Sequence, residues 1–379
     1  MKNKELESES RREAMCAGGA GMMAAMFGGL LGVANGVRAE PVKGAVPVVD
    51  KLAVRVVTDS YQLALAPSTS IAGVKVERFS FPVTAERPKR SVLSEFGLSL
   101  HLESTIGSDT RQVLIDFGYT SEALMNNLEV FGIKPENLQA LILSHGHFDH
   151  FGGMLGFLEA TKGKLKPGIP FYLGGEECFC TRELNIPDRI GNFGYLDRDA
   201  IKAYNVQATF AEKPSIIAGH AFTTGQIARA TFERVLSPTR MRVGMNNGIG
   251  CYPDQINPEK KQATVVPDDF EHEQATCFNV KDRGLVVMTS CGHRGVVNSV
   301  KRAMAVAGTN KVHAVLGGFH LAPHKDEYVR ETVMALKEIN PDLVIPMHCT
   351  GEAFQEIAAK EMPGKYIRSY TGTRYTFGA

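Results

Sequence analysis

The amino-acid sequence predicts an α/β sandwich in which mixed sheets lie in the middle and helices lie outside. Two observations support this fold class: the first part of the chain is rich in strand patterns, and the last part alternates strands with helices. With 379 residues, 44% of them hydrophobic and 22% charged, the chain can bury a large core in one or two domains.

The strand-rich part begins at residues 51–60, where valines recur at the spacing of a strand. Residues 63–86 are ambiguous, because Pro67, Gly73 and Pro82 interrupt any regular pattern. Further strands are expected at residues 91–103, 111–116, 138–144 and 169–173, with helices at 121–131 and 153–161.

The last part of the chain alternates between the two kinds of element. The near-continuous apolar run 284–289 predicts a buried strand. After it, helices are expected at residues 296–307 and 326–339, and strands at 312–316 and 343–346. Residues 174–280 are the least regular part, with glycine-rich, aromatic and polar stretches. We expect long loops there, around a site, where selectivity for a substrate usually resides.

The strongest chemical signal follows the apolar strand 138–144. His145, His147, Asp149 and His150 come within six positions, and a strand that ends here would bring them together. Imidazole nitrogens and a carboxylate oxygen are the ligands that Zn²⁺ prefers, and they also suit iron and manganese. His145 and His147 are two positions apart and face the same way in an extended segment, so they would share one metal.

This H-x-H-x-D-H motif after a strand resembles the signature of the metallo-β-lactamase superfamily. The ordered motifs around it are similar to one branch, whose members are commonly named 7,8-dihydropterin-6-methyl-4-(β-D-ribofuranosyl)aminobenzene-5'-phosphate synthase-like proteins. The resemblance extends over roughly residues 52–379. The segments that carry it are residues 97–100, 114–118, 141–150, 284–293, 317–321 and 346–351.

The resemblance implies an αββα four-layer sandwich with its metals at one edge. It implies that Asp149 and His150 serve a second metal and that His348, after the strand 343–346, binds the same metal. Asp116 matches the superfamily's first acidic motif, whose carboxylate typically supports a histidine ligand through a hydrogen bond. Two zinc ions per chain are the first expectation, a single-metal site is the alternative, and iron or manganese could replace zinc.

Two more histidines follow strands and are expected near the site. His293 stands after Cys291-Gly292, where many relatives hold an aspartate that bridges two metals. It is therefore either a metal ligand or a contact of the substrate or a phosphate. His320 is expected to act as a ligand or in acid–base or substrate contacts. The middle histidine of lactamase relatives has no obvious counterpart, because His220 is close to that stretch but out of register.

Residues 1–39 are expected to form a signal peptide. Paired arginines precede the uncharged, weakly hydrophobic stretch 14–37, and small residues follow at the predicted cleavage site. This pattern suggests the twin-arginine route, which exports folded proteins, and a periplasmic or otherwise exported location. The alternative is an uncleaved membrane anchor, since the stretch is long enough to span a bilayer. Residues 40–50 are predicted to be a linker, and 51–379 the folded domain.

The net charge and the cysteine content limit the partners and the disulfides that are expected. A formal net charge of +1 gives no global field for nucleic acid or an anionic membrane, so we expect membrane contact only for export or anchoring. The seven cysteines have no repeated spacing, and we predict buried or idle thiols rather than a disulfide framework. The expected partner is a small-molecule substrate, and the sequence does not determine the oligomeric state.

The sequence as a whole predicts a metal-dependent hydrolase of this superfamily. Neutral imidazoles and one carboxylate leave a bound metal positive, which lowers the pKa of its water from ~16 toward ~7 and makes hydroxide available. The hydroxide would attack an ester, lactone, phosphoester or related small molecule. Asp149 would orient it, and His320 would stabilise the developing charge or the leaving group.

Three loop arginines, Arg182, Arg189 and Arg229, could bind an anionic substrate. Two other classes of protein stay open: an iron-based redox protein, and a non-catalytic metal- or ligand-binding protein of the same fold. An exported protein is not expected to take part in cytoplasmic pterin assembly, so we do not take the branch name as the reaction.

Overall fold

The computed structural model describes residues 36–80, 85–87, 89–186, 189–236 and 239–378. The chain divides into two compact units, Met1–Arg38 and Ala39–Ala379. The first unit holds the short strand β1 (Val37–Arg38), and the rest of the predicted signal peptide lies almost entirely outside the described residues. Within the described part of the chain, no helix is long and apolar enough to cross a membrane.

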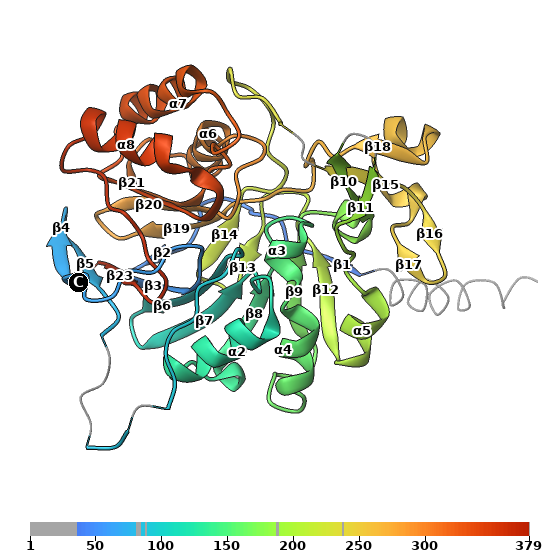
Figure 1. The fold of residues 1–379 in the computed structure, drawn as a ribbon, viewed down its shortest axis with the longest axis horizontal. Coiled ribbons are helices and arrows are strands. Elements are labelled where there is room, and N and C mark those ends of the chain that lie inside the picture. Colours follow the sequence, from blue (N-terminus) through green and yellow to red (C-terminus); the bar gives the residue numbers. More distant parts are fainter. Residues whose placement is uncertain (1–35, 81–84, 88, 187–188, 237–238, 379) are drawn as a thin grey trace, which may run out of the picture. The chain divides into compact units, whose positions relative to one another are not determined.

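The second unit is built around two mixed sheets (Figure 1). Across the first sheet, the strands of this unit follow the order β12 (Val206–Phe210), β9 (Ile169–Leu173), β8 (Leu138–Ile142), β7 (Asp109–Ile115), β6 (Ser99–Ile106), β3 (Lys51–Thr58), β23 (Arg374–Phe377), β5 (Val74–Glu77) and β4 (Thr69–Ile71). Neighbouring strands pair parallel from β12 to β7 and antiparallel from β7 to β4.

The second sheet has an antiparallel half and a parallel half. β19 and β20 pair antiparallel, and β20, β21 and β22 run parallel, joined by helices. Its strands follow the order β13 (Ile216–Ile217), β14 (Ala221–Thr223), β19 (Thr276–Val280), β20 (Gly284–Thr289), β21 (Val312–Gly318) and β22 (Leu343–Met347), with β2 (Val48–Val49) beside β19. Parallel strands place their carboxyl ends at one edge, where polar side chains can gather.

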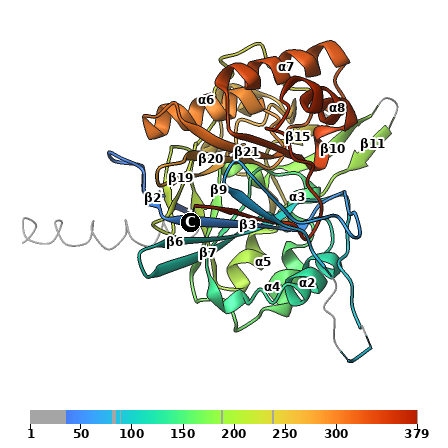
Figure 2. The ribbon, with the colours of Figure 1, turned by 90° about the vertical axis from the view of Figure 1, so that its left-hand side faces the viewer.

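The two sheets face each other across one apolar core, to which Val54 and Leu100 come from the first sheet and Val286 and Leu316 from the second. Helices cover both outer faces (Figures 1 and 2). Over the first sheet lie α2 (Ser121–Val130), α4 (Met154–Ala160) and α5 (Arg198–Ala203), and over the second lie α6 (Val296–Ala307), α7 (Asp326–Ile339) and α8 (Glu352–Glu361). The predicted αββα four-layer sandwich is confirmed.

Local sequence explains where these helices begin and end. α2 starts after Thr120, whose hydroxyl accepts a hydrogen bond from the backbone N–H of Ala123 and so caps the helix. α6 ends at Gly308 in the left-handed conformation that glycine adopts without steric cost. Apart from the short helix α3 (Phe148–Phe151), the shorter turns are the 3₁₀ segments η1 (Pro135–Asn137), η2 (Glu176–Phe179), η3 (Pro253–Gln255), η4 (Pro258–Gln262) and η5 (His348–Thr350).

The segment 174–280 is more ordered than the long loops that the sequence predicts. It holds a small antiparallel sheet of β11 (Arg189–Asn192), β10 (Thr181–Ile186), β15 (Thr239–Arg242) and β18 (Val265–Pro267), and the hairpin of β16 (Met245–Asn246) and β17 (Ile249–Gly250). A disulfide joins Cys180 to Cys251 across this region. The prediction of unpaired thiols is therefore wrong for these two, because a pairing over 71 residues leaves no spacing signal.

Most predicted elements are confirmed. β9, β20, α6 and α7 have the predicted bounds, and β3, β7, β8, β21, β22 and α2 differ from them by one to three residues at an end. The strand predicted from residue 91 begins only at Ser99. Residues 40–50, the predicted linker, belong to the second unit, where Val42 N donates to Pro214 O at 2.8 Å and β2 pairs with β19.

Candidate metal centre

The motif after β8 forms a short loop before α3, at the carboxyl edge of the first sheet (Figure 1). Gly146 lies against the guanidinium of Arg182, where a Cβ atom would clash, so the loop closes tightly here. His145 and His147 flank this glycine, and their ring centroids are 4.9 Å apart. The two imidazoles lie side by side, as the sequence predicts.

A first group of ligating atoms comes from His145, His147 and His293, all buried. Their nitrogens lie within 4.8 Å of one another. His293 comes from the turn after β20, and its ring centroid lies 4.8 Å from both other rings. His293 thus takes the third place in this group, where the sequence offered no middle histidine.

A second group comes from Asp149, His150 and His348, whose ligating atoms also lie within 4.8 Å of one another. His348 follows β22, so its side chain arrives from the second sheet. Its Nε2 lies 3.1 Å from Asp149 Oδ2, and His150 Nε2 lies 3.6 Å from the same oxygen. The two groups bring together residues that are nearly 200 positions apart in the sequence.

The atoms that point into this centre fit divalent metal ions. His145 Nε2, His150 Nε2, Asp149 Oδ1 and both ring nitrogens of His293 are buried and make no hydrogen bond to the described residues. A buried polar atom without a partner costs about 1–3 kcal/mol, and such a cost repeated in one place is explained by a bound cation. Nitrogen and carboxylate donors in this number suit zinc, iron or manganese.

Asp116 orients one histidine of each group. Its Oδ2 accepts a hydrogen bond from His150 Nδ1 at 2.7 Å and from the hydroxyl of Ser144 at 2.8 Å. That hydroxyl lies 2.9 Å from His145 Nδ1, so His145 donates to it. Both imidazoles therefore carry their proton on Nδ1 and present the Nε2 lone pair to the centre, the support role expected for Asp116.

His147 is oriented by residues that the sequence did not single out for this role. Its Nε2 lies 2.9 Å from Thr239 Oγ1, and that hydroxyl donates to Asp268 Oδ2 at 3.4 Å. Asp268 in turn accepts from Arg182 Nε at 2.7 Å. His147 therefore donates from Nε2 and presents Nδ1 to the first group. Arg182, predicted as a substrate contact, is buried in this network instead.

The electrostatic environment keeps most imidazoles neutral. Burial lowers the pKa of His145 and His293 well below the usual value, and it lowers the pKa of His147 to about 3. Neutral imidazole is the form that binds a metal. Burial would raise the pKa of Asp149, but His150 and His348 hold it below its usual range, so the carboxylate is charged.

His348 differs from the other ligands. Burial lowers its pKa, but the neighbouring Cys349 and Asp149 outweigh burial and raise the pKa to about 9. A proton and a divalent cation therefore compete for His348 Nε2 at neutral pH. The backbone N–H of His348 donates to Asp59 Oδ1 at 2.8 Å, and this fixes the position of the residue.

Two thiols and His320 lie beside the ligand groups. Cys291 Sγ is 3.0 Å from Cys349 Sγ and 3.5 Å from His320 Nδ1. The ring of His320 lies 4.0 Å from that of His293, so His320 stands at the edge of the first group. The ligating atoms of Cys291, His293 and His320 also lie within 4.8 Å of one another. This closeness is compatible with either role expected for His320.

Three residues of the centre have left-handed backbone conformations, with φ of 56° at Asp116, 46° at His320 and 51° at His348. Each follows directly or closely after a strand, where the chain must turn away from the sheet. Such conformations cost about 1–3 kcal/mol each for residues other than glycine, and they gather at functional sites.

All the predicted site residues except Arg189, whose side chain is not described, can be placed. The ligands predicted from sequence, Asp116 and His320 lie in one cluster; their metal and catalytic roles stay predictions. Arg229 is exposed. His220 lies elsewhere, against Ser104 at 3.0 Å, so it does not supply the middle histidine. Thr239 and Asp268 were missed, since no local pattern marks a residue whose partner is distant in sequence.

Comparison with known proteins agrees with this centre. Residues 105–167, which include the H-x-H-x-D-H motif, match the profile of the metallo-beta-lactamase superfamily. The solved structure of Tm1679, described as a metal-dependent hydrolase of the beta-lactamase superfamily, superposes with a TM-score of 0.59 at 23% identity, over 85% of this chain and 98% of that one. The predicted resemblance to the metallo-β-lactamase superfamily is confirmed, and the chain has that superfamily's fold.

Two curated relatives from Methanocaldococcus jannaschii are similar over most of their length. One, named 7,8-dihydropterin-6-methyl-4-(beta-D-ribofuranosyl)-aminobenzene-5'-phosphate synthase, is 27% identical over 284 residues, 74% of this chain and 89% of the relative. The other, named Uncharacterized protein MJ0448, is 24% identical over 266 residues, 70% of this chain and 88% of the relative. The first carries the name of the branch that the sequence resembles.

Proposed function

We propose that this protein is a metal-dependent hydrolase that acts on an ester, lactone, phosphoester or related small molecule. The observation that carries the proposal is the pair of ligand groups, His145, His147 and His293 beside Asp149, His150 and His348, with buried atoms that have no other partner. We propose two Zn²⁺ ions per chain, because both groups combine imidazoles with at most one carboxylate.

When bound, divalent cations at these groups supply Lewis acidity, which makes hydroxide available near neutral pH and polarises a carbonyl or phosphoryl oxygen. Asp149 Oδ1 has no partner among the described residues and can accept a hydrogen bond from the attacking water, which orients it. His320 is partly exposed beside His293 and can hold or release a proton at the leaving group.

We propose that the substrate enters at a narrow pocket beside these residues. Its lining includes His293, His320, Arg234 and a stacked pair, His324 and Tyr328, whose ring centroids are 4.1 Å apart. A stacked aromatic pair and a guanidinium suit a substrate with a planar or anionic group. The name of one curated relative, a synthase, refers to a pterin and a phosphate. A phosphorylated substrate would agree with that name and with the pocket lining.

The first test is elemental analysis of the purified full chain. About two zinc ions per chain are expected from the two ligand groups. Iron in their place would favour the redox class, and no metal after zinc is added back would favour the non-catalytic binding class. Ester, lactone and phosphoester panels then follow, with His145→Ala/His147→Ala as the inactive reference. If this variant hydrolyses a substrate as fast as the unaltered chain, the metal centre takes no part in the reaction.

We also propose that the protein is exported, as its N-terminal pattern predicts. The disulfide between Cys180 and Cys251 supports this location, since disulfides persist in oxidising compartments. Mass spectrometry of the protein from its native host should find a mature chain that begins near residue 40. An intact Met1 in a membrane fraction would instead support the uncleaved anchor, and an intact Met1 in the soluble cytoplasmic fraction would contradict export.

A further inference from the structure

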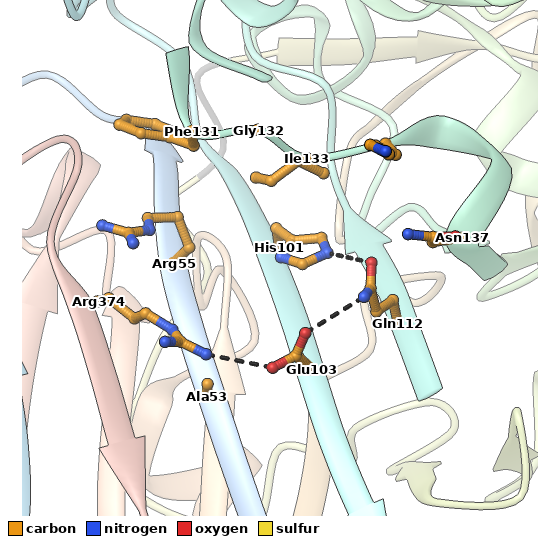
Figure 3. A pocket seen from close by; sticks show the side chains of 11 residues that line it. Ala53, Arg55, His101, Glu103, Gln112, Phe131, Gly132, Ile133, Asn137 and Arg374 are labelled. Carbon is orange, nitrogen blue, oxygen red and sulfur yellow. Dashed lines mark hydrogen bonds and ion pairs between the residues drawn. The ribbon is translucent and has the colours of Figure 1, made fainter. Parts of the chain in front are cut away.

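A second pocket opens on the first sheet, and none of the residues that line it belongs to the metal centre (Figure 3). Its volume is about 200 Å³. Arg55 stands on β3 between Val54 and Val56, whose side chains enter the core between the two sheets, so Arg55 points to the opposite face. The pocket therefore lies on the side of the sheet that the helices cover. Phe131, at the C-terminal end of α2, lines one side of it.

The floor of this pocket carries a row of basic residues. Arg374 on β23 pairs in register with Arg55 on β3, and Arg55 pairs in register with His101 on β6. Like charges directly opposite each other on neighbouring strands destabilise a sheet. A compensating negative charge is therefore expected close to this row.

Glu103 is the carboxylate in the pocket lining, and it offsets only part of the positive charge. Glu103 accepts hydrogen bonds from Arg374 Nη2 and from Gln112 Nε2, both at 3.2 Å, so both of its oxygens are used (Figure 3). Gln112 Oε1 lies 3.2 Å from His101 Nε2, which donates to it. Burial lowers the pKa of His101 to about 4, so this ring is neutral at pH 7.

Arg55 has no direct carboxylate partner. Glu77 on β5 faces Arg374 in register and attracts Arg55 electrostatically, but its ion pair is with Lys75, at 2.8 Å. Arg55 donates from Nη1 to the carbonyl of Gly372 at 2.6 Å and lies 5.1 Å from the ring centroid of Phe131. Among the described residues, no carboxylate comes within ion-pair distance of its guanidinium. Burial, followed by the charge of Arg374, lowers its pKa to about 10, so it stays charged at neutral pH. With Lys134, the lining has three positive groups and one negative group, a net charge of +2.

We propose that this pocket binds a small phosphate, either free or carried on a small molecule. The Arg55 guanidinium keeps N–H donors that no described residue accepts, and the guanidinium fork matches phosphate oxygens two at a time. The net charge of +2 balances a phosphate dianion, and Phe131 closes one side against water. Lys134 adds a mobile point charge at the rim. The ligand thus supplies the negative charge that the row of basic residues lacks.

The test is calorimetric titration of the full chain with inorganic phosphate at low salt. The His145→Ala/His147→Ala variant is titrated as well, so that phosphate at the metal centre does not mask the result. We expect saturable binding in both proteins. Arg55→Gln should weaken it by about tenfold or more, because hydrogen bonds to charged groups are lost. Arg330→Gln is the matched control, since Arg330 is an exposed arginine that pairs with Glu361.

Unchanged binding by Arg55→Gln, or no binding in the unaltered chain, would overturn the proposal. Should Arg55→Gln fail to fold by circular dichroism, Lys134→Gln, at an exposed position, must still weaken phosphate. Acetate at equal concentration should not compete, and equal affinity for acetate would also count against the phosphate assignment. Glycerol 3-phosphate separates the two sources: tighter binding than inorganic phosphate assigns a phosphate ester, and equal binding assigns the free ion.

Discussion

The two halves of the metal centre share Asp116 but otherwise depend on different parts of the fold. His147, in the first group, is oriented by Thr239 and through it by Arg182, which belong to the small sheet of β10 and β15. The second group is oriented by Asp116 and Asp59, at the ends of β7 and β3 in the main sheet. The small sheet is thus part of the centre's support, and each half can be perturbed separately.

Removing one ligand from each half should have the largest effect. His293→Ala takes a ligand only from the first group and His348→Ala only from the second. Each variant should fall from about two metal ions to about one, and hydrolysis should drop roughly a thousandfold, since the lost Lewis acid is worth several kcal/mol. Elemental analysis and initial rates check this. Loss of both ions in either variant would show that the halves are not separable.

Opening the disulfide should affect the first half more than the second. Cys180→Ala/Cys251→Ala releases a cross-link over 71 residues. The loop-closure relation gives about 4 kcal/mol of stability for a loop of this length. Urea unfolding measures the loss, and metal content shows which half weakens. Cys277→Ala is the control, because this thiol is buried and unpaired. An equal loss from both halves would contradict the assigned support of the small sheet.

Acidification should empty the second half first. His348 has its pKa raised to about 9, so below that pH a proton occupies it and metal binding must release the proton. His147 has its pKa lowered to about 3, so it stays neutral over the same range. Metal affinity should fall about tenfold per pH unit below 9 in His293→Ala, and much less in His348→Ala. Chelator competition between pH 6 and pH 9 measures it, and identical slopes would refute the distinction.

The smallest of these effects is expected from the carboxylates that support the ligands. Asp116→Asn should weaken both halves by about 10–100-fold, because Asp116 orients His150 directly and His145 through Ser144. Asp59→Asn should weaken the second half alone, since Asp59 contacts His348. Metal affinities by chelator competition separate the two. If Asp116→Asn weakens metal binding in only one half, Asp116 does not support both halves as proposed.

Much of the fold and most of the cluster could be predicted from the sequence because their signals are local. The H-x-H-x-D-H motif is one short segment, and the other histidines each follow an apolar strand that the pattern marks. Parallel strands end at one edge, so the topology brings His293 and His348 to the motif. Long elements such as α6 and α7 have clear periodicity, which fixes their bounds.

What could not be predicted depends on partners far apart in the chain. Arg182 and Asp268 are 86 residues apart, and neither has a neighbour that marks it as buried. Cys180 and Cys251 resemble other isolated cysteines until the small sheet brings them together. The four-residue strand β23 was missed as well, since its place beside β3 rests on pairing with a strand more than 300 positions away.

The left-handed backbone at Asp116, His320 and His348 has a consequence for the stability of this chain. Glycine adopts this conformation without steric cost, so it would relieve the strain at each of the three positions. Stabilising substitutions of this kind are readily found in natural proteins. A carboxylate and two imidazoles in these conformations therefore lower the stability of the chain at positions where the centre uses their polar atoms.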